Sequence, residues 1–75
     1  MAPSQCHAAR VLLNWSVEDL ANESGVDVDA VKIFESSVRK ISDNVVIRMQ
    51  ATLENAGVVF LLADYSDGAV VRLRE

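Results

Sequence analysis

Two short stretches with helical spacing, separated by Gly25, constrain this chain more than any other feature. The first helix would turn Leu20 and Ala21 inward, and the second would turn Val31 and Phe34 inward. Glycine takes up the left-handed conformation that ends a helix at little steric cost. We therefore predict two helices that pack against each other and are joined by a tight turn at Gly25.

This two-helix unit is strongly acidic. Between residues 15 and 35, Lys32 stands against the acids Glu18, Asp19, Glu23, Asp27, Asp29 and Glu35. The whole chain has 11 acids against 7 Lys and Arg, a net charge of −4. The layout is that of a helix-turn-helix, whose second helix usually enters a groove of DNA. DNA-binding domains are normally basic, because neutralising phosphates drives affinity. The layout and the charge therefore point to different functions.

The length and composition predict one folded domain. A chain of 75 residues is near the lower limit for a self-sufficient core, and 51 % hydrophobic residues is too many for a disordered segment. We expect a mostly α protein with a single domain over residues 1–75. Its helical body would span about 4–57, and a β-hairpin would span about 58–74.

Capping residues mark the starts of the helices. Pro3 suits the start of the first helix. Ser16 begins the next with Asp19 in the acidic position of a capping box, Asp27 begins a helix over about 28–36, and Ser42 begins a fourth that stops near residue 57. The positions expected to face inward are Ala8, Val11, Leu12 and Trp15 in the first helix, and Val46, Met49, Leu53 and Ala56 in the fourth.

Two β-prone runs, 58–63 and 69–74, flank the hairpin signal Asp67-Gly68. The first run is apolar on both faces, and a small helical body can cover only one of them. We therefore expect a homodimer in which strands from two copies meet across a two-fold axis. The alternative is a hairpin folded back entirely on its own helices. The expected dimer contacts are Val58, Val59, Phe60, Leu61, Leu62, Val71 and Leu73.

Several other functions are disfavoured by the residues present. Cys6 and His7 are the only soft metal ligands, so we expect no metal site, and a single cysteine suits a reducing cytoplasm. Residues 1–4 do not resemble the start of a signal peptide, and the apolar run 58–63 is too short to cross a membrane. No phosphate-cradling loop and no nucleophile beside a base is evident. We expect a cytoplasmic protein without cofactor or catalytic activity.

Nearly the whole chain, from about residue 5 to 74, carries a recurring pattern. Its parts are Ala-Arg-Val-Leu-Leu-Asn-Trp-Ser at 9–16, Asp-Leu-Ala at 19–21, Gly-Val at 25–26, Phe-Glu at 34–35, Val-Arg-Lys at 38–40, Asn44, Leu-Glu-Asn-Ala-Gly at 53–57, Phe60 and Val-Arg-Leu-Arg at 71–74. In this order they resemble the Cro/phage-repressor (XRE) helix-turn-helix family, and in particular its small single-domain bacterial members with a C-terminal hairpin.

The resemblance implies a two-fold dimer that reads paired half-sites of double-stranded DNA. It implies that the helix on the phosphate backbone begins with Ser16 and Val17. Base edges would be read by Val28, Asp29, Lys32 and Ile33. Flanking phosphates would be met by Ser36, Ser37, Arg39, Lys40 and Asn44.

The departures from the family pattern fall at these working positions. The family commonly has Gln in place of Val17, Ser or Thr in place of Asp27, and a turn Gly in place of Ser37. It commonly has polar or basic residues in place of Val28, Asp29 and Ile33. This chain therefore matches the family pattern better at the scaffold positions than at the positions that would read DNA.

Two hypotheses follow. In the first, the chain is a dimeric sequence-specific transcriptional regulator, a repressor or autoregulator of a small operon or mobile element. In the second, it has lost DNA binding and acts as an anti-activator or antirepressor that captures another regulator. The second would use an exposed apolar patch of Val17, Val28 and Ile33, rimmed by acids. Family resemblance favours the first hypothesis and the charge of residues 16–35 favours the second.

Overall fold

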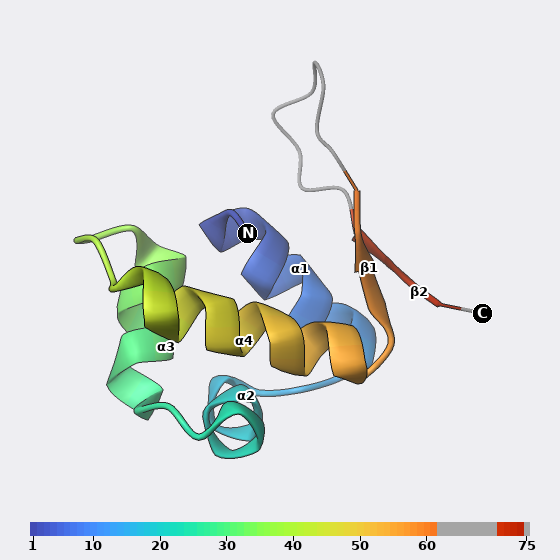
Figure 1. Cartoon of the computed structure of the whole chain (residues 1–75), viewed down its shortest axis with the longest axis horizontal. Coiled ribbons are helices and arrows are strands. Elements are labelled where there is room, and N and C mark those ends of the chain that lie inside the picture. The colour runs from blue at the N-terminus through green and yellow to red at the C-terminus, as the bar shows by residue number, and fades with distance from the viewer. Residues whose placement is uncertain (62–70, 75) are drawn as a thin grey trace.

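Four helices and two short strands make up the computed structural model, which describes residues 1–61 and 71–74. The elements are α1 (Pro3–Leu13), α2 (Val17–Ser24), α3 (Val28–Ser36), α4 (Asp43–Asn55), β1 (Val58–Phe60) and β2 (Val71–Leu73). Figure 1 shows the connection between α3 and α4 at one end of the molecule and the strands at the other. The predicted mostly helical class with a pair of C-terminal strands is confirmed. The predicted turn at Asp67-Gly68 and the dimer contact Leu62 lie outside the described residues.

Local capping explains why α2 and α3 begin and end where they do. The hydroxyl of Ser16 accepts from the backbone N–H of Asp19 at 3.0 Å, and the Asp19 carboxylate accepts from the N–H of Ser16 at 2.9 Å. Gly25 ends α2 at φ 72°, and the Asp27 carboxylate accepts from the N–H of Asp29 at 3.2 Å to open α3. These caps confirm the predicted turn, which leaves α2 and α3 packed against each other.

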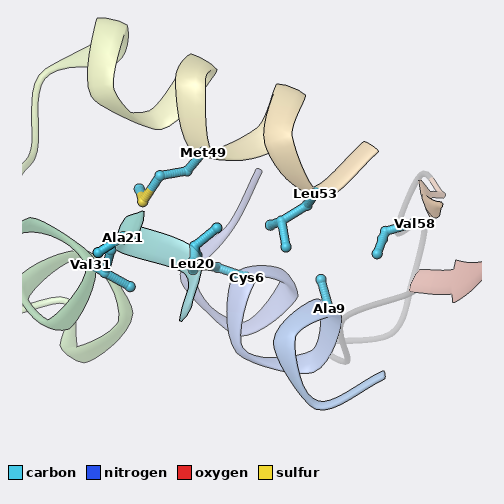
Figure 2. Close-up of a cluster of buried hydrophobic side chains, with 8 residues drawn as sticks. All are labelled: Cys6, Ala9, Leu20, Ala21, Val31, Met49, Leu53 and Val58. Carbon is cyan, nitrogen blue, oxygen red and sulfur yellow. The ribbon is translucent and has the colours of Figure 1, made fainter. Parts of the chain in front are cut away.

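The core lies between all four helices and β1. Figure 2 shows its eight buried side chains converging from these elements: Cys6, Ala9, Leu20, Ala21, Val31, Met49, Leu53 and Val58. Phe34 and Trp15 are half-buried and pack against this cluster, as predicted.

Two of the predicted inward-facing sets need correction. In α1, Val11 and Leu12 are 61 % and 40 % exposed, because the buried face of this helix runs through Cys6, Ala9 and Arg10 instead. In α4, which Ser42 caps as predicted, Met49 and Leu53 are buried. Ala56 is exposed because it caps the C-terminal end of the helix, after its last turn.

The strands pair antiparallel, with Val58 opposite Leu73, Val59 opposite Arg72 and Phe60 opposite Val71. Residues opposite each other share a face of the sheet. Val58 is fully buried, and Phe60 and Val71 pack against the core, so this face belongs to the protomer itself. A contact between Val58 and a second copy is therefore not available in this fold.

The other face of β1 carries Val59 and, just beyond the strand, Leu61. The Leu61 side chain is 38 % exposed. On the core-facing side, Leu73 at the end of β2 is exposed to a similar extent, 41 %. The helical body therefore covers one face of the strands and leaves the other available, as expected from the two-sided apolar run.

A buried ion pair joins α1 to α3. Nε of Arg10 donates to one carboxylate oxygen of Glu35 at 2.6 Å, and a terminal nitrogen donates to the other at 2.7 Å. The two side chains are only 11 % and 12 % exposed. Arg10 also donates to the backbone carbonyl of Trp15 at 3.0 Å, and Sγ of Cys6 donates to Glu35 at 3.2 Å. This bidentate pair fixes the end of α3 on α1.

The charge state of this cluster follows from its contacts. Burial alone would raise the pKa of Glu35, but the hydrogen bonds from Arg10 and Cys6 and the charge of Arg10 outweigh it and hold this pKa below its usual range. Burial raises the pKa of the Cys6 thiol, and the neighbouring Glu35 raises it further. Cys6 is therefore a protonated donor within the cluster.

We predict that replacing Glu35 with Gln strongly destabilises the fold. The substitution keeps the shape of the side chain but leaves the Arg10 guanidinium buried without its counter-charge, which costs roughly 3 kcal/mol. Urea denaturation monitored by circular dichroism measures this change. Glu23→Gln is the matched control, because Glu23 is exposed, and its effect should stay within about 0.5 kcal/mol.

The difference between wild type and Glu35→Gln should also depend on pH. Because the pKa of Glu35 is lower in the folded state, its contribution is fully present above the unfolded value of about 4.3 and is lost as pH falls through the folded value. The free energies of unfolding of the two proteins should therefore converge as pH falls below about 4. A difference that stays constant from neutral to acidic pH would contradict this account.

Candidate nucleic-acid interface

One side of α3 faces solvent and forms a hollow with the connection that follows it. Asp29 and Lys32 are exposed, Ile33 is half-buried, and these side chains line a hollow of about 400 Å³ together with Arg39 and Ile41. The structure therefore brings together four of the residues predicted to contact DNA, namely Asp29, Lys32, Ile33 and Arg39. We call this hollow the α3 groove.

The α3–α4 connection places Arg39 and Lys40 beside the end of α3. Ser37 ends the helix in the left-handed conformation, at φ 59°, and its N–H donates to the carbonyls of Ile33 at 3.1 Å and Phe34 at 3.2 Å. This reversal leads the chain directly to Arg39 and Lys40, both of which are exposed. The two cations that the resemblance assigns to phosphate contacts are thus exposed beside the end of α3.

The remaining polar residues predicted to contact DNA are exposed, but two of their hydroxyls already make hydrogen bonds within the fold. Ser16, Ser36 and Asn44 are exposed. The Ser36 hydroxyl donates to the carbonyl of Ile33 at 3.0 Å, and the Ser16 hydroxyl serves the cap of α2. The hydroxyls of Ser16 and Ser36 are therefore already engaged within the fold before any ligand arrives.

The apolar patch expected of Val17, Val28 and Ile33 is less exposed than the sequence predicts. All three side chains are half-buried, and none ranks among the exposed large hydrophobic residues. Val17 and Val28 are the first residues of α2 and α3, and both pack against the core. They close the core at the start of each helix, so they do not offer a free apolar surface.

Several acids of the two-helix unit have structural roles that cannot be read from the number of acids in the sequence. Asp19 and Asp27 cap helix N-termini, where the helix dipole favours a negative charge, and Glu35 is paired with Arg10. Half of the six acids are therefore used within the fold, which leaves Glu18, Glu23 and Asp29.

The cations around the α3 groove are not used in this way. Across residues 1–61 and 71–74, the ion pairs within 4.0 Å join Glu35 to Arg10 and to His7. Lys32, Arg39 and Lys40 are exposed and have no carboxylate at that distance among those residues. Two of these cations, Lys32 and Arg39, line the α3 groove together with the carboxylates of Asp27 and Asp29.

Sequence reasoning missed the Arg10–Glu35 pair and the shape of the α3 groove. Arg10 and Glu35 are 25 positions apart, and no local pattern joins them. Arg10 sits between apolar neighbours on α1, and a buried arginine in such a position signals a buried acid elsewhere.

We predict that Ser37→Gly stabilises the protein. Ser37 has a Cβ in the left-handed region, and glycine removes that steric cost, so the free energy of unfolding should rise by about 1 kcal/mol. Ser36→Gly is the matched control in the last turn of α3 and should lower stability instead, because glycine weakens helices. Thermal denaturation of both variants checks this, and a destabilised Ser37→Gly protein would contradict it.

Within the part of the chain that the structure describes, no group of three or more His, Cys, Asp or Glu is placed to hold a metal ion. No helix of residues 1–61 is long and apolar enough to cross a membrane. Comparisons of the sequence with models of known protein families and with curated proteins find no match.

Proposed function

We propose that this chain is a dimeric, sequence-specific DNA-binding regulator of transcription of the Cro/phage-repressor type. In this proposal α2 and α3 form a helix-turn-helix, and α3 is the recognition helix. The observation that carries it is the α3 groove, where Asp29, Lys32 and the half-buried Ile33 of α3 lie beside Arg39 of the α3–α4 connection. Lys40 follows directly beside it.

The two kinds of residue on this surface suit two kinds of DNA contact. Arg39 and Lys40 are exposed cations on a connection beside the helix, which suits phosphate binding. Asp29 can accept a hydrogen bond from the amino group of cytosine, and Ile33 can contact a thymine methyl group. Affinity and sequence preference would therefore come from different residues.

The net negative charge of the chain opposes DNA binding less strongly than the sequence suggests. Asp19 and Glu35 are committed to the cap of α2 and to the buried pair, whereas Asp27 caps α3 and also lines the α3 groove with Lys32 and Arg39. Salt dependence is set by the phosphates actually contacted. A few contacts predict modest affinity with a shallow salt dependence.

Dimerisation would supply a second recognition helix for the second half-site of the DNA. The outer face of β1, with Val59 and Leu61, is the part of the strands that the helices do not cover. A two-fold contact there would present two copies of α3, and palindromic operators place their half-sites about 34 Å apart. The rival role, capture of another regulator, loses its expected surface because Val17 and Val28 pack into the core.

The decisive experiment separates the two kinds of contact on DNA from upstream of the gene. Replacing both Arg39 and Lys40 with Ala should weaken binding to all sequences alike and reduce the slope of log K against log salt by about four, because each protomer of the dimer loses two phosphate contacts. Asp29→Asn should instead change base preference, by roughly 1–3 kcal/mol at the affected pair. Fluorescence anisotropy at several salt concentrations measures both.

The matched control for charge is the double replacement of Arg72 and Arg74 with Ala. It removes the same number of cations from the opposite end of the molecule (Figure 1). Because Arg72 shares the outer face of the strands with Val59, the comparison is made at a concentration at which sedimentation shows this variant to be dimeric, and there the salt slope should be unchanged. A folded wild-type protein that shows no specific binding at about 50 mM salt would overturn the proposed function.

We predict that Leu61→Glu converts the dimer to a monomer. Burying a new carboxylate in an apolar contact without a partner is costly, so association should weaken by at least about tenfold. Val38→Glu is the control, since Val38 is 76 % exposed on the α3–α4 connection, away from the strands. Sedimentation velocity at about 100 μM, a high concentration on the affinity scale, reports the outcome, and a monomeric wild type there would refute the dimer.

A further inference from the structure

A second hollow lies against the α3–α4 connection and shares Arg39 and Ile41 with the α3 groove. Its volume is about 500 Å³, within the range of roughly 300–1,000 Å³ typical of small-molecule sites. Apolar side chains supply much of its wall, including Phe34 and Val46, which also pack against the core. We call it the connection pocket.

The charges at the connection pocket define what it can hold. Arg39 and Lys40 line it, and so does Asp43, the first residue of α4. Among the lining side chains, two cations stand against one carboxylate, and this excess of positive charge complements an anionic head group such as a carboxylate. The adjoining apolar wall of Phe34, Ile41 and Val46 suits a hydrocarbon or aromatic body.

We propose that the connection pocket binds a small apolar monocarboxylate, and that its occupation releases the protein from DNA. The binding site stands on the pocket itself, whereas its effect on DNA rests on the proposed function. A carboxylate held by Arg39 and Lys40 competes for the cations assigned to phosphate. Because Ile41 and Arg39 also line the α3 groove, a ligand that moves them alters the surface beside Lys32 and Ile33. Ligand and DNA therefore oppose each other reciprocally.

The first test follows backbone amides of the whole chain by two-dimensional NMR during titration at neutral pH. The probes are octanoate, 1-octanol with the same apolar chain and no charge, and inorganic phosphate with charge and no chain. Octanoate should give saturable shifts confined to residues around the pocket, with an affinity at least about tenfold above that of either control. Equal binding of octanol or of phosphate overturns the proposal, as does an absence of localised shifts.

Variants assign the charges individually. Replacing Arg39 and Lys40 with Ala should weaken octanoate binding at least about tenfold and leave octanol binding unchanged, while the Arg72 and Arg74 double variant should bind octanoate normally. Asp43→Asn removes a repelling carboxylate and should tighten octanoate binding. All these side chains are exposed, so the folded state is retained. A weaker or unchanged affinity in Asp43→Asn contradicts the monoanion assignment.

The second test measures DNA affinity with and without saturating octanoate, with octanol as the control. DNA binding should weaken at least about tenfold with octanoate only. If octanoate binds and DNA does not, the ligand site is supported and the proposed function is refuted. If DNA binds and octanoate does not, the ligand site is refuted and the proposed function is supported. If both bind independently, the regulatory role of the pocket is refuted.

Discussion

The buried pair of Arg10 and Glu35 is the interaction on which the arrangement of this molecule depends. It connects the last turn of α1 to the end of α3 with two short, charge-assisted hydrogen bonds. With α3 held there, Val31 points into the core, while Asp29 and Lys32 are left on the solvent side. The pair therefore stabilises the fold and also determines which face of α3 is offered to a ligand. Its third contact, to the carbonyl of Trp15, ties in the start of the α1–α2 connection.

What the sequence predicted well was local. Ser16 with Asp19, Asp27 with the start of α3, and Gly25 act within a few residues of where they stand, so their patterns are readable without a tertiary structure. The face of α1 was misjudged because Val11 and Leu12 are apolar whereas Arg10 is charged. Burial there follows the partner on α3, and a charged residue with a buried partner can displace better hydrophobic candidates.

The candidate site was predictable in position but not in accessibility. The pattern placed Asp29, Lys32, Ile33 and Arg39 near one another, and the structure gathers them around the α3 groove. It could not reveal that Val17 and Val28 close the core. Nor could it reveal the two hollows that meet at Arg39 and Ile41, since their shape depends on how the α3–α4 connection folds.

The position of Cys6 gives the protein a built-in reporter of its own opening. The side chain has no exposed surface, and its thiol is held protonated beside Glu35. Reagents that modify cysteine attack the thiolate and need access to it. In the native state this thiol should therefore not react with alkylating reagents. It becomes labelled only when α1 separates from α3, so the labelling rate measures how often that separation occurs. Because the sequence contains no other cysteine, that signal needs no correction for a second thiol.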